Sequence, residues 1–201
     1  MIPVPGLDDI RVYWLKVRRS GTVLHGYLLY AASDHRFPEY MADEGIGDLD
    51  IWTGEECGIF VFQSPPEGWI KHAARTDHIW SKLVKEVYGN GTSDEVIEFG
   101  NDTKFAVNGK ETTLKNLFAD CTDSYAHRDL IKQVLEHFSL PATSHPCLIL
   151  FQDLYGKQFW HVALDDLLNK PEGDLRKALK IWFSGSEFGR LIEEARRASR
   201  H

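Results

Sequence analysis

Two dense apolar runs dominate the first third of the chain, with a short polar-capped segment between them. The runs are Val23–Ala31 and Cys57–Gln63, and their density predicts strands that are buried on both faces. Ser33–Asp34 is typical of a helix N-cap, so we expect a short helix from His35 to about Glu44. The order strand, helix, strand predicts a parallel βαβ unit. A further strand is expected ahead of it, at Ile10–Val17.

The last third of the chain shows the same alternation with clearer helical spacing. Its apolar residues recur three and four apart in the predicted helices, whereas the predicted strands are short continuous runs. A capping box beginning at Ser184 is expected to open the final helix. The expected elements are, in chain order, a helix at Tyr125–Phe138, strands at Cys147–Phe151 and Gln158–Leu164, and helices at Asp174–Phe183 and Glu187–Ser199.

The block between these parts has a different pattern. Glu67–Tyr88 carries one apolar stripe at helical spacing, and Val96–Phe99 and Phe105–Val107 read as short strands. Asn108–Gly109 predicts a β-hairpin, because both central positions of a type I′ turn need positive φ.

Composition limits the class of protein. The chain has 201 residues, of which 43% are hydrophobic and 26% charged, and this predicts a single globular domain, 1–201. The formal net charge of −7 disfavours a general nucleic-acid binder, since phosphate backbones repel it. Three cysteines without a CxxC pair disfavour a zinc site and a secreted disulfide framework, so a cytoplasmic location is expected. The sequence predicts neither a signal peptide nor a membrane segment.

With the middle block set aside, the order of elements resembles the thioredoxin-like fold. The resemblance rests on Leu24–Ala31, Gly58–Phe62, His145–Phe151 and Phe159–Leu164, and covers about half of the chain. It implies a mixed sheet flanked by helices, a cis proline at Pro146 before the third core strand, and a helical and β-hairpin insertion at approximately 64–122. Without the resemblance, a trans proline at the start of an edge strand is an equal alternative.

The resemblance does not extend to redox chemistry. Where the family carries Cys-x-x-Cys, this chain has Ala32 to Phe37 (ASDHRF), which contains no cysteine. Without a thiolate there is no nucleophile for disulfide exchange. A redox-inactive protein is therefore expected.

The histidines and cysteines are the candidates for other chemistry. His35, His145 and His161 could approach one another near strand ends, with Asp34 or Asp153 adding a carboxylate. No spacing places two metal ligands on one helix face, so neither a metal nor a cofactor is predicted. Cys147 beside His145 or His161 could form a thiol enzyme, but a cysteine inside a core strand would not reach substrate.

Acidic residues gather in what we expect to be a loop between Asp43 and Glu56. Such a loop is most simply a solvated surface, and it could also receive a basic protein partner. Trp52 and Trp69 are the tryptophans expected to be exposed at an interface. The residues of this docking set are Asp43, Glu44, Asp48, Asp50, Trp52, Glu55, Glu56 and Trp69.

These observations favour a non-catalytic protein-interaction module, of the antitoxin, immunity or regulatory type. Its binding groove is expected between Ser33, Asp34 and Arg36 on one side and His145–Pro146 on the other. The alternative is a small hydrolase or transferase that uses His35, His145 or Cys147. A homo-oligomer remains open.

Overall fold

A computed structural model provides the structure of the protein. The structure describes residues 2–3, 7, 21–31, 33–34, 36–41, 45–63, 104–107, 110–113, 116, 119–122, 124–168 and 174–199. The strands expected at 10–17 and 96–99, the helix expected at 67–88 and the hairpin turn at 108–109 lie outside these residues, as do His35, Asp43, Glu44 and Trp69.

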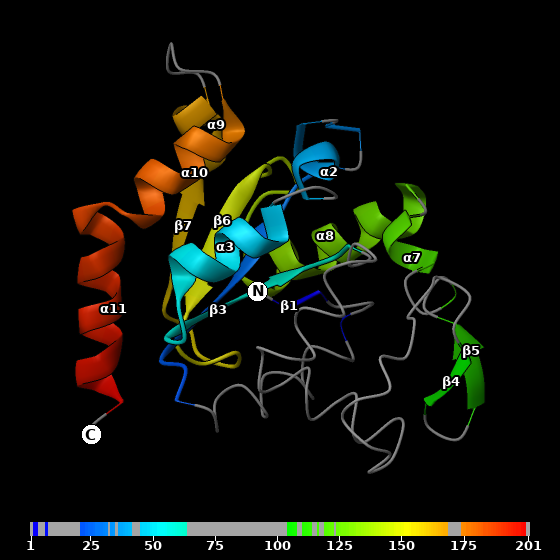
Figure 1. The fold of residues 1–201 in the computed structure, drawn as a ribbon, viewed down its shortest axis with the longest axis horizontal. Helices are drawn as coiled ribbons and strands as arrows, with labels where there is room; N and C mark the ends of the chain where they lie inside the picture. Colours follow the sequence, from blue (N-terminus) through cyan, green and yellow to red (C-terminus); the bar gives the residue numbers. More distant parts are fainter. Residues whose placement is uncertain are drawn as a thin grey trace, which may run out of the picture.

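A mixed five-stranded sheet forms the centre of the molecule, with the strand order β1-β3-β2-β6-β7 (Figure 1). Strand β2 pairs in parallel with β3 and antiparallel with β6, and β6 pairs antiparallel with β7. These pairings confirm the parallel βαβ unit expected from sequence, and they make the strand expected at Gln158–Leu164 the antiparallel neighbour of β6. The strands are β1 (Ile2–Pro3), β2 (Leu24–Leu29), β3 (Cys57–Val61), β6 (Cys147–Phe151) and β7 (Phe159–Ala163).

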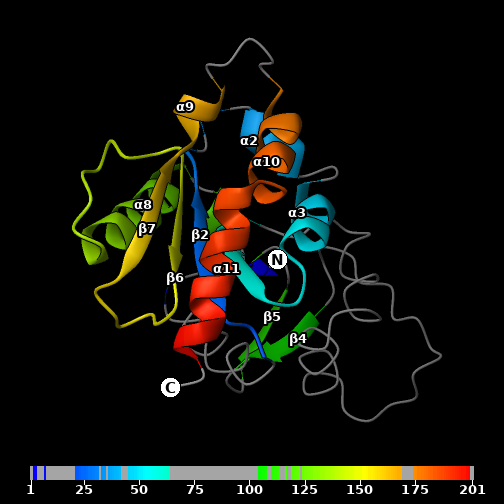
Figure 2. The same cartoon turned by 90° about the vertical axis from the view of Figure 1, so that its left-hand side faces the viewer.

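Helices cover both faces of the sheet (Figure 2). One face packs against α8 (Ser124–His137), through the apolar stripe that the sequence predicts for this helix. The other face packs against α3 (Ile46–Thr53), α10 (Leu175–Phe183) and α11 (Ser186–Ala198). Strands β2, β3 and β6 are buried along their whole length because each lies between these two layers.

Short elements complete the described part of the chain. Helix α2 (Arg36–Tyr40) follows β2, and α9 (Leu164–Leu168) follows β7 directly. Strands β4 (Lys104–Val107) and β5 (Lys110–Thr113) pair as an antiparallel two-stranded sheet of their own, next to α7 (Ala119–Thr122). Within the described ranges, no helix has the length and apolar character needed to span a bilayer.

Two local expectations are wrong. The acidic link expected between Asp43 and Glu56 contains helix α3, whose inward side is formed by Ile46 and Leu49. The sequence pattern does not predict this helix, because the segment is short and acidic and has only one or two apolar residues in each turn. The capping box is also wrong: Gly185 is the N-cap of α11, and Ser184 is instead the C-cap of α10.

Candidate functional site

The residues expected to form the groove lie at one end of the central strands. Leu29, at the end of β2, is opposite Cys147, at the start of β6. Ser33–Asp34 therefore leaves the sheet at the same end at which His145–Pro146 enters it. The peptide bond between His145 and Pro146 is cis.

One side of this groove carries a neutralised charge pair. The Arg36 guanidinium donates from Nε to Asp34 Oδ1 at 2.9 Å and from Nη2 to Oδ2 at 2.7 Å. This hydrogen bonding raises the pKa of Arg36. Because the pair is bidentate, the two charges largely cancel at the surface of the groove. Ser33 beside it is exposed.

On the other side of the groove, the backbone of His145 is open. Ser144 N–H donates to the Pro141 carbonyl at 2.9 Å, and Leu164 N–H donates to the Pro146 carbonyl at 3.0 Å. These bonds fix the segment before and after His145. No described residue hydrogen-bonds to the N–H or the carbonyl of His145 itself. The segment is therefore held on both sides of His145, while the N–H and the carbonyl of His145 meet no partner among the described residues.

His127 of α8 lies close to His145, and the sequence analysis did not identify it. Its side chain is 3% exposed, and Nδ1 has no hydrogen-bond partner among the described residues. Burial lowers the pKa of His127, a backbone hydrogen bond with Phe62 opposes this shift, and the charge of His145 adds to it. The ring is therefore neutral near pH 7 and carries a buried nitrogen without a partner.

A sequence signal for His127 does exist. The residue precedes Leu130, Ile131 and Val134 by three, four and seven positions, so it lies on the apolar face of α8. A histidine at such a position is expected to be buried, although the pattern does not reveal what it contacts.

Tyr30 links the ends of the two parallel strands next to this histidine. Its ring stacks on Phe37 of α2, with centroids 5.0 Å apart, and lies 5.9 Å from the His127 ring. Its hydroxyl donates to Gln63 Oε1, just beyond β3. The residues expected to form the groove thus lie near the carboxyl ends of β2 and β3, where open α/β sheets commonly bind ligands.

Two other residues expected to approach His145, namely His161 and Asp153, do not lie together. His161 of β7 is exposed, with Nε2 3.4 Å from the Ser144 carbonyl, so it lies beside the groove. Asp153 follows the far end of β6 and does not join it, which contradicts its expected approach to these histidines. Among the described residues, no group of three or more His, Cys, Asp and Glu could hold a metal ion.

Cys147 is unsuited to nucleophilic attack. The residue is 0% exposed at the start of β6, and burial raises the pKa of its thiol to about 12. The thiol is therefore protonated at neutral pH and is shielded from solvent. This geometry disfavours the thiol form of the enzyme alternative.

Two carboxylates of the acidic docking set form hydrogen bonds or ion pairs within the protein itself. Asp48 accepts hydrogen bonds from Tyr40 and Arg176, and Glu56 forms an ion pair with Arg196, which lowers the pKa of Glu56. Asp48 therefore links α3 to α10, and Glu56 links α11 to the turn before β3. Glu55 is exposed and Asp50 is half-buried.

Trp52 was expected to be exposed as an interface anchor. It is half-buried and packs against the core on the α10 and α11 side of the sheet. Only part of this ring is therefore exposed, because α3 turns the rest of it inward.

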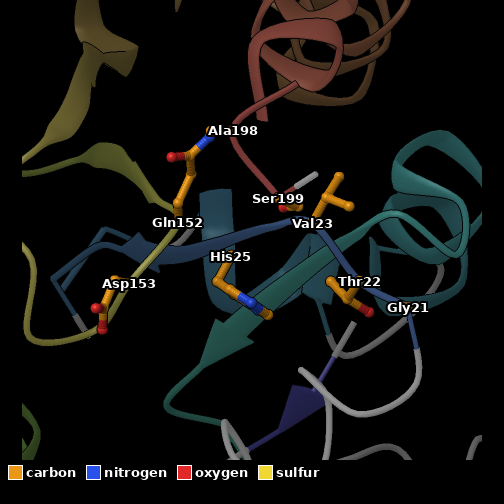
Figure 3. A pocket seen from close by; sticks show the side chains of 8 residues that line it. All are labelled: Gly21, Thr22, Val23, His25, Gln152, Asp153, Ala198 and Ser199. Carbon is orange, nitrogen blue, oxygen red and sulfur yellow. The ribbon is translucent and has the colours of Figure 1, made fainter. Parts of the chain in front are cut away.

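A cavity lies at the opposite end of β2 from the groove (Figure 3). Its volume is about 400 Å³. Residues at the start of β2, the end of β6 and the end of α11 line it. It shares no residue with the groove described above.

Comparisons of the chain with models of protein families, with curated proteins and with solved structures gave no significant match.

Proposed function

We propose that the protein is a redox-inactive, thioredoxin-like binding module that takes an extended segment of a protein partner beside Pro146. Support comes from the order of its elements. Strands β2 and β3 are parallel, a cis bond precedes the third core strand β6, and the β6–β7 hairpin leads toward the closing helices. On this proposal the hairpin β4–β5 belongs to an insertion between β3 and α8.

The observation that carries the proposal is the open backbone of His145. In the thioredoxin-like arrangement, the backbone next to the cis proline pairs with an extended peptide. Here the N–H and carbonyl of His145 meet no described partner, although Ser144 and Pro146 on either side are hydrogen-bonded. An extended segment that hydrogen-bonds to the N–H and the carbonyl of His145 would satisfy both atoms.

The absence of redox chemistry follows from the residues at the end of β2. Ser33, Asp34 and Arg36 occupy the corner where the family carries its cysteines, and the Asp34 carboxylate is paired with Arg36. Cys147 is buried with a raised pKa, so it does not replace the missing thiolate. The module would bind its partner without forming a mixed disulfide.

The charge of the chain favours a basic partner. The net charge of −7 supports long-range attraction of a positively charged protein. Of the docking set, Glu55 is exposed, whereas Asp48 and Glu56 form ion pairs with Arg176 and Arg196 of the same chain. An antitoxin or immunity role would fit this charge, with specificity supplied by the groove.

The proposal is tested with a displayed library of random peptides selected against the folded protein. Selected peptides would then be measured by fluorescence anisotropy against two variants. Ser33→Trp places a bulky ring at the exposed mouth of the groove, and the control Ser186→Trp places the same ring on the exposed start of α11.

We expect S33W to weaken the selected peptides at least tenfold and S186W to leave them unchanged. Equal binding to both variants would show that the peptides bind elsewhere. A selection that yields no peptide with a Kd below about 100 μM, roughly −5.5 kcal/mol, would also overturn the proposal.

A second candidate function is favoured by the buried His127, whose pKa is also lowered by the charge of His145. A neutral buried imidazole beside a more accessible one is an arrangement that can serve acid–base chemistry. This is the enzyme alternative, now with His127 added. A panel of activated ester substrates tests it: turnover that disappears in His145→Gln would replace the binding proposal, whereas equal turnover in H145Q would exclude this candidate.

A further inference from the structure

The cavity at the start of β2 has the size of a small-molecule site. Its volume of about 400 Å³ falls within the range of roughly 300–1,000 Å³ that is usual for ligand pockets. It is separated from the groove by β2, whose six residues span about 20 Å. The lining residues are Gly21, Thr22, Val23, His25, Gln152, Asp153, Ala198 and Ser199 (Figure 3).

Three elements far apart in sequence hold this lining in place. The first is the chain entering β2, where Thr22 Oγ1 donates to the Glu55 carbonyl at 3.1 Å and Val23 N–H donates to the Glu56 carbonyl at 2.9 Å. The second is the end of β6, which pairs Phe151 with His25 across the sheet. The third is α11, which ends at the cavity. The walls are therefore preformed by the sheet and a helix.

The floor of the cavity is largely buried. His25 is 1% exposed, and its ring lies 5.9 Å from the Phe151 ring in a tilted arrangement. Figure 3 shows His25 between the β6 side, with Gln152 and Asp153, and the Thr22 side. A ligand in this space would contact a flat ring below it and polar groups around it.

Among the described residues of the lining, Asp153 is the charged one, and neither lysine nor arginine is among them. Asp153 Oδ1 accepts from Tyr155 N–H at 3.0 Å, which orients the carboxylate while Oδ2 has no described donor. Gln152 adds an amide oxygen beside it.

The end of α11 adds to this negative potential. Ala198 and Ser199 belong to the last turn of a 13-residue helix, where backbone carbonyls leave a partial negative charge. Arg196 in the same turn is held by Glu56 and Glu193, so its guanidinium is directed to those carboxylates. Arg197, the other arginine of this turn, is exposed and is not among the described residues that line the cavity. Among the described groups of the lining, the Asp153 carboxylate and the helix carbonyls therefore favour a positive ligand.

We infer that this cavity binds a small organic cation carrying an amino or guanidino group. The positive group would be placed at Asp153 Oδ2, with the rest of the molecule against His25 and Val23. This site is independent of the proposed peptide groove, because none of its residues belongs to that groove.

The test compares two ligands of nearly the same shape that differ in charge. L-arginine carries a guanidinium and L-citrulline a neutral urea group, and putrescine provides a second cation. Binding would be measured by isothermal titration calorimetry and by the shift in Tm. The variant Asp153→Asn keeps an oxygen that can accept from Tyr155 N–H but removes the charge. Asp166→Asn, on an exposed residue of α9, is the matched control.

We expect arginine or putrescine to bind saturably, citrulline to bind at least fivefold more weakly than arginine, and D153N to lose at least fivefold in affinity. D166N should bind as the natural chain does. Ala198→Trp, which fills the cavity from an exposed position, should abolish binding without lowering Tm in the absence of ligand.

Three results would overturn the inference: no saturable binding of either cation, equal binding of arginine and citrulline, or unchanged affinity in D153N. None of these three results tests peptide binding at the groove. The S33W experiment should in turn leave cation binding unchanged, so the two proposals fail separately.

Discussion

Arg176 of α10 and Asp48 of α3 form an ion pair across 128 positions of the chain. Arg176 Nε lies 2.7 Å from Asp48 Oδ2, and Nη2 donates to Oδ1 at 3.1 Å. Tyr40 adds a third hydrogen bond to the same carboxylate at 3.1 Å. A single carboxylate, 11% exposed, therefore ties together three helices on one face of the sheet.

Replacing Asp48 by alanine should destabilise the protein. The substitution leaves the half-exposed Arg176 guanidinium and the Tyr40 hydroxyl without their shared acceptor, at a cost of about 2 kcal/mol in the free energy of unfolding. Urea denaturation would measure it. Glu136→Gln is the control, because the Lys132–Glu136 pair is exposed on both sides and its loss should cost less than about 0.5 kcal/mol. Equal effects of the two substitutions would contradict the structural role of Asp48.

Gly26 is required by the close approach of two strands in the centre of the sheet. A Cβ at this position would lie 2.7 Å from Leu150 Cδ2 and 2.8 Å from the Ile149 carbonyl oxygen. Because one of these neighbours is backbone, the contact is not relieved by a side-chain rotation. We expect Gly26→Ala to destabilise the protein by about 1–3 kcal/mol.

Gly189 provides the opposite case. It lies within α11 with nothing within 4 Å of the added Cβ, so Gly189→Ala should stabilise the protein by about 0.5–1 kcal/mol. Thermal unfolding of both variants checks the pair. A stable G26A protein would show that β2 and β6 are more widely spaced than the structure has them.

The strands and long helices could be predicted from sequence because burial leaves a direct pattern. The runs that form β2, β3 and β6 are apolar at nearly every position, since helices cover both of their faces. The final two helices likewise carry their buried residues at helical spacing. Local periodicity is sufficient where one element buries a complete face or both faces.

Features that depend on distant partners were not predictable. Arg176 of α10 stabilises helix α3 through its ion pair with Asp48. In the sequence alone, where this partner is not known, Asp48 resembles a solvated acidic residue. His127 is identified as a site residue only when α8 brings it to His145. The cavity at His25 likewise needs β2, β6 and α11 together. A one-dimensional pattern records none of these pairings.

Cysteine reactivity follows from burial. Cys147 is 0% exposed with a pKa raised to about 12, and burial also raises the pKa of Cys57 well above its usual range. At pH 7.5 the thiolate fraction of Cys147 is about a thousandfold or more below that of a free cysteine with a pKa of about 8.5. We expect iodoacetamide to label both residues at least a thousandfold more slowly in the native protein than in urea, as followed by peptide mass spectrometry. Rapid native labelling of Cys147 would restore the thiol-enzyme alternative.

His127 makes stability depend on pH in a defined direction. Burial lowers its pKa below the ordinary value of 6.5, so the unfolded chain binds a proton more readily than the folded protein does. The stability from the neutral ring is therefore complete above pH 6.5 and is lost as the pH falls below it, with a slope of at most about 1.4 kcal/mol per pH unit for one proton.

Glu56 also loses its contribution on acidification, but in a lower range. Its pKa is depressed from 4.5, so its ion pair with Arg196 is lost only as the pH falls below that value. Between pH 6.5 and 4.5, the change in the free energy of unfolding therefore reports on His127 without a contribution from Glu56.

The measurement is urea denaturation of the natural chain and of His127→Gln at pH 7.5, 6.5, 5.5 and 5.0. We expect the free energy of unfolding of the natural chain to fall with pH through this range, and that of H127Q to fall distinctly less. His161→Gln, which removes an exposed imidazole from β7, is the control for the loss of a histidine as such. Parallel pH profiles for the natural chain and H127Q would mean that the His127 ring accepts a proton in the folded protein as easily as in the unfolded one, and the neutral imidazole beside the groove would no longer be supported.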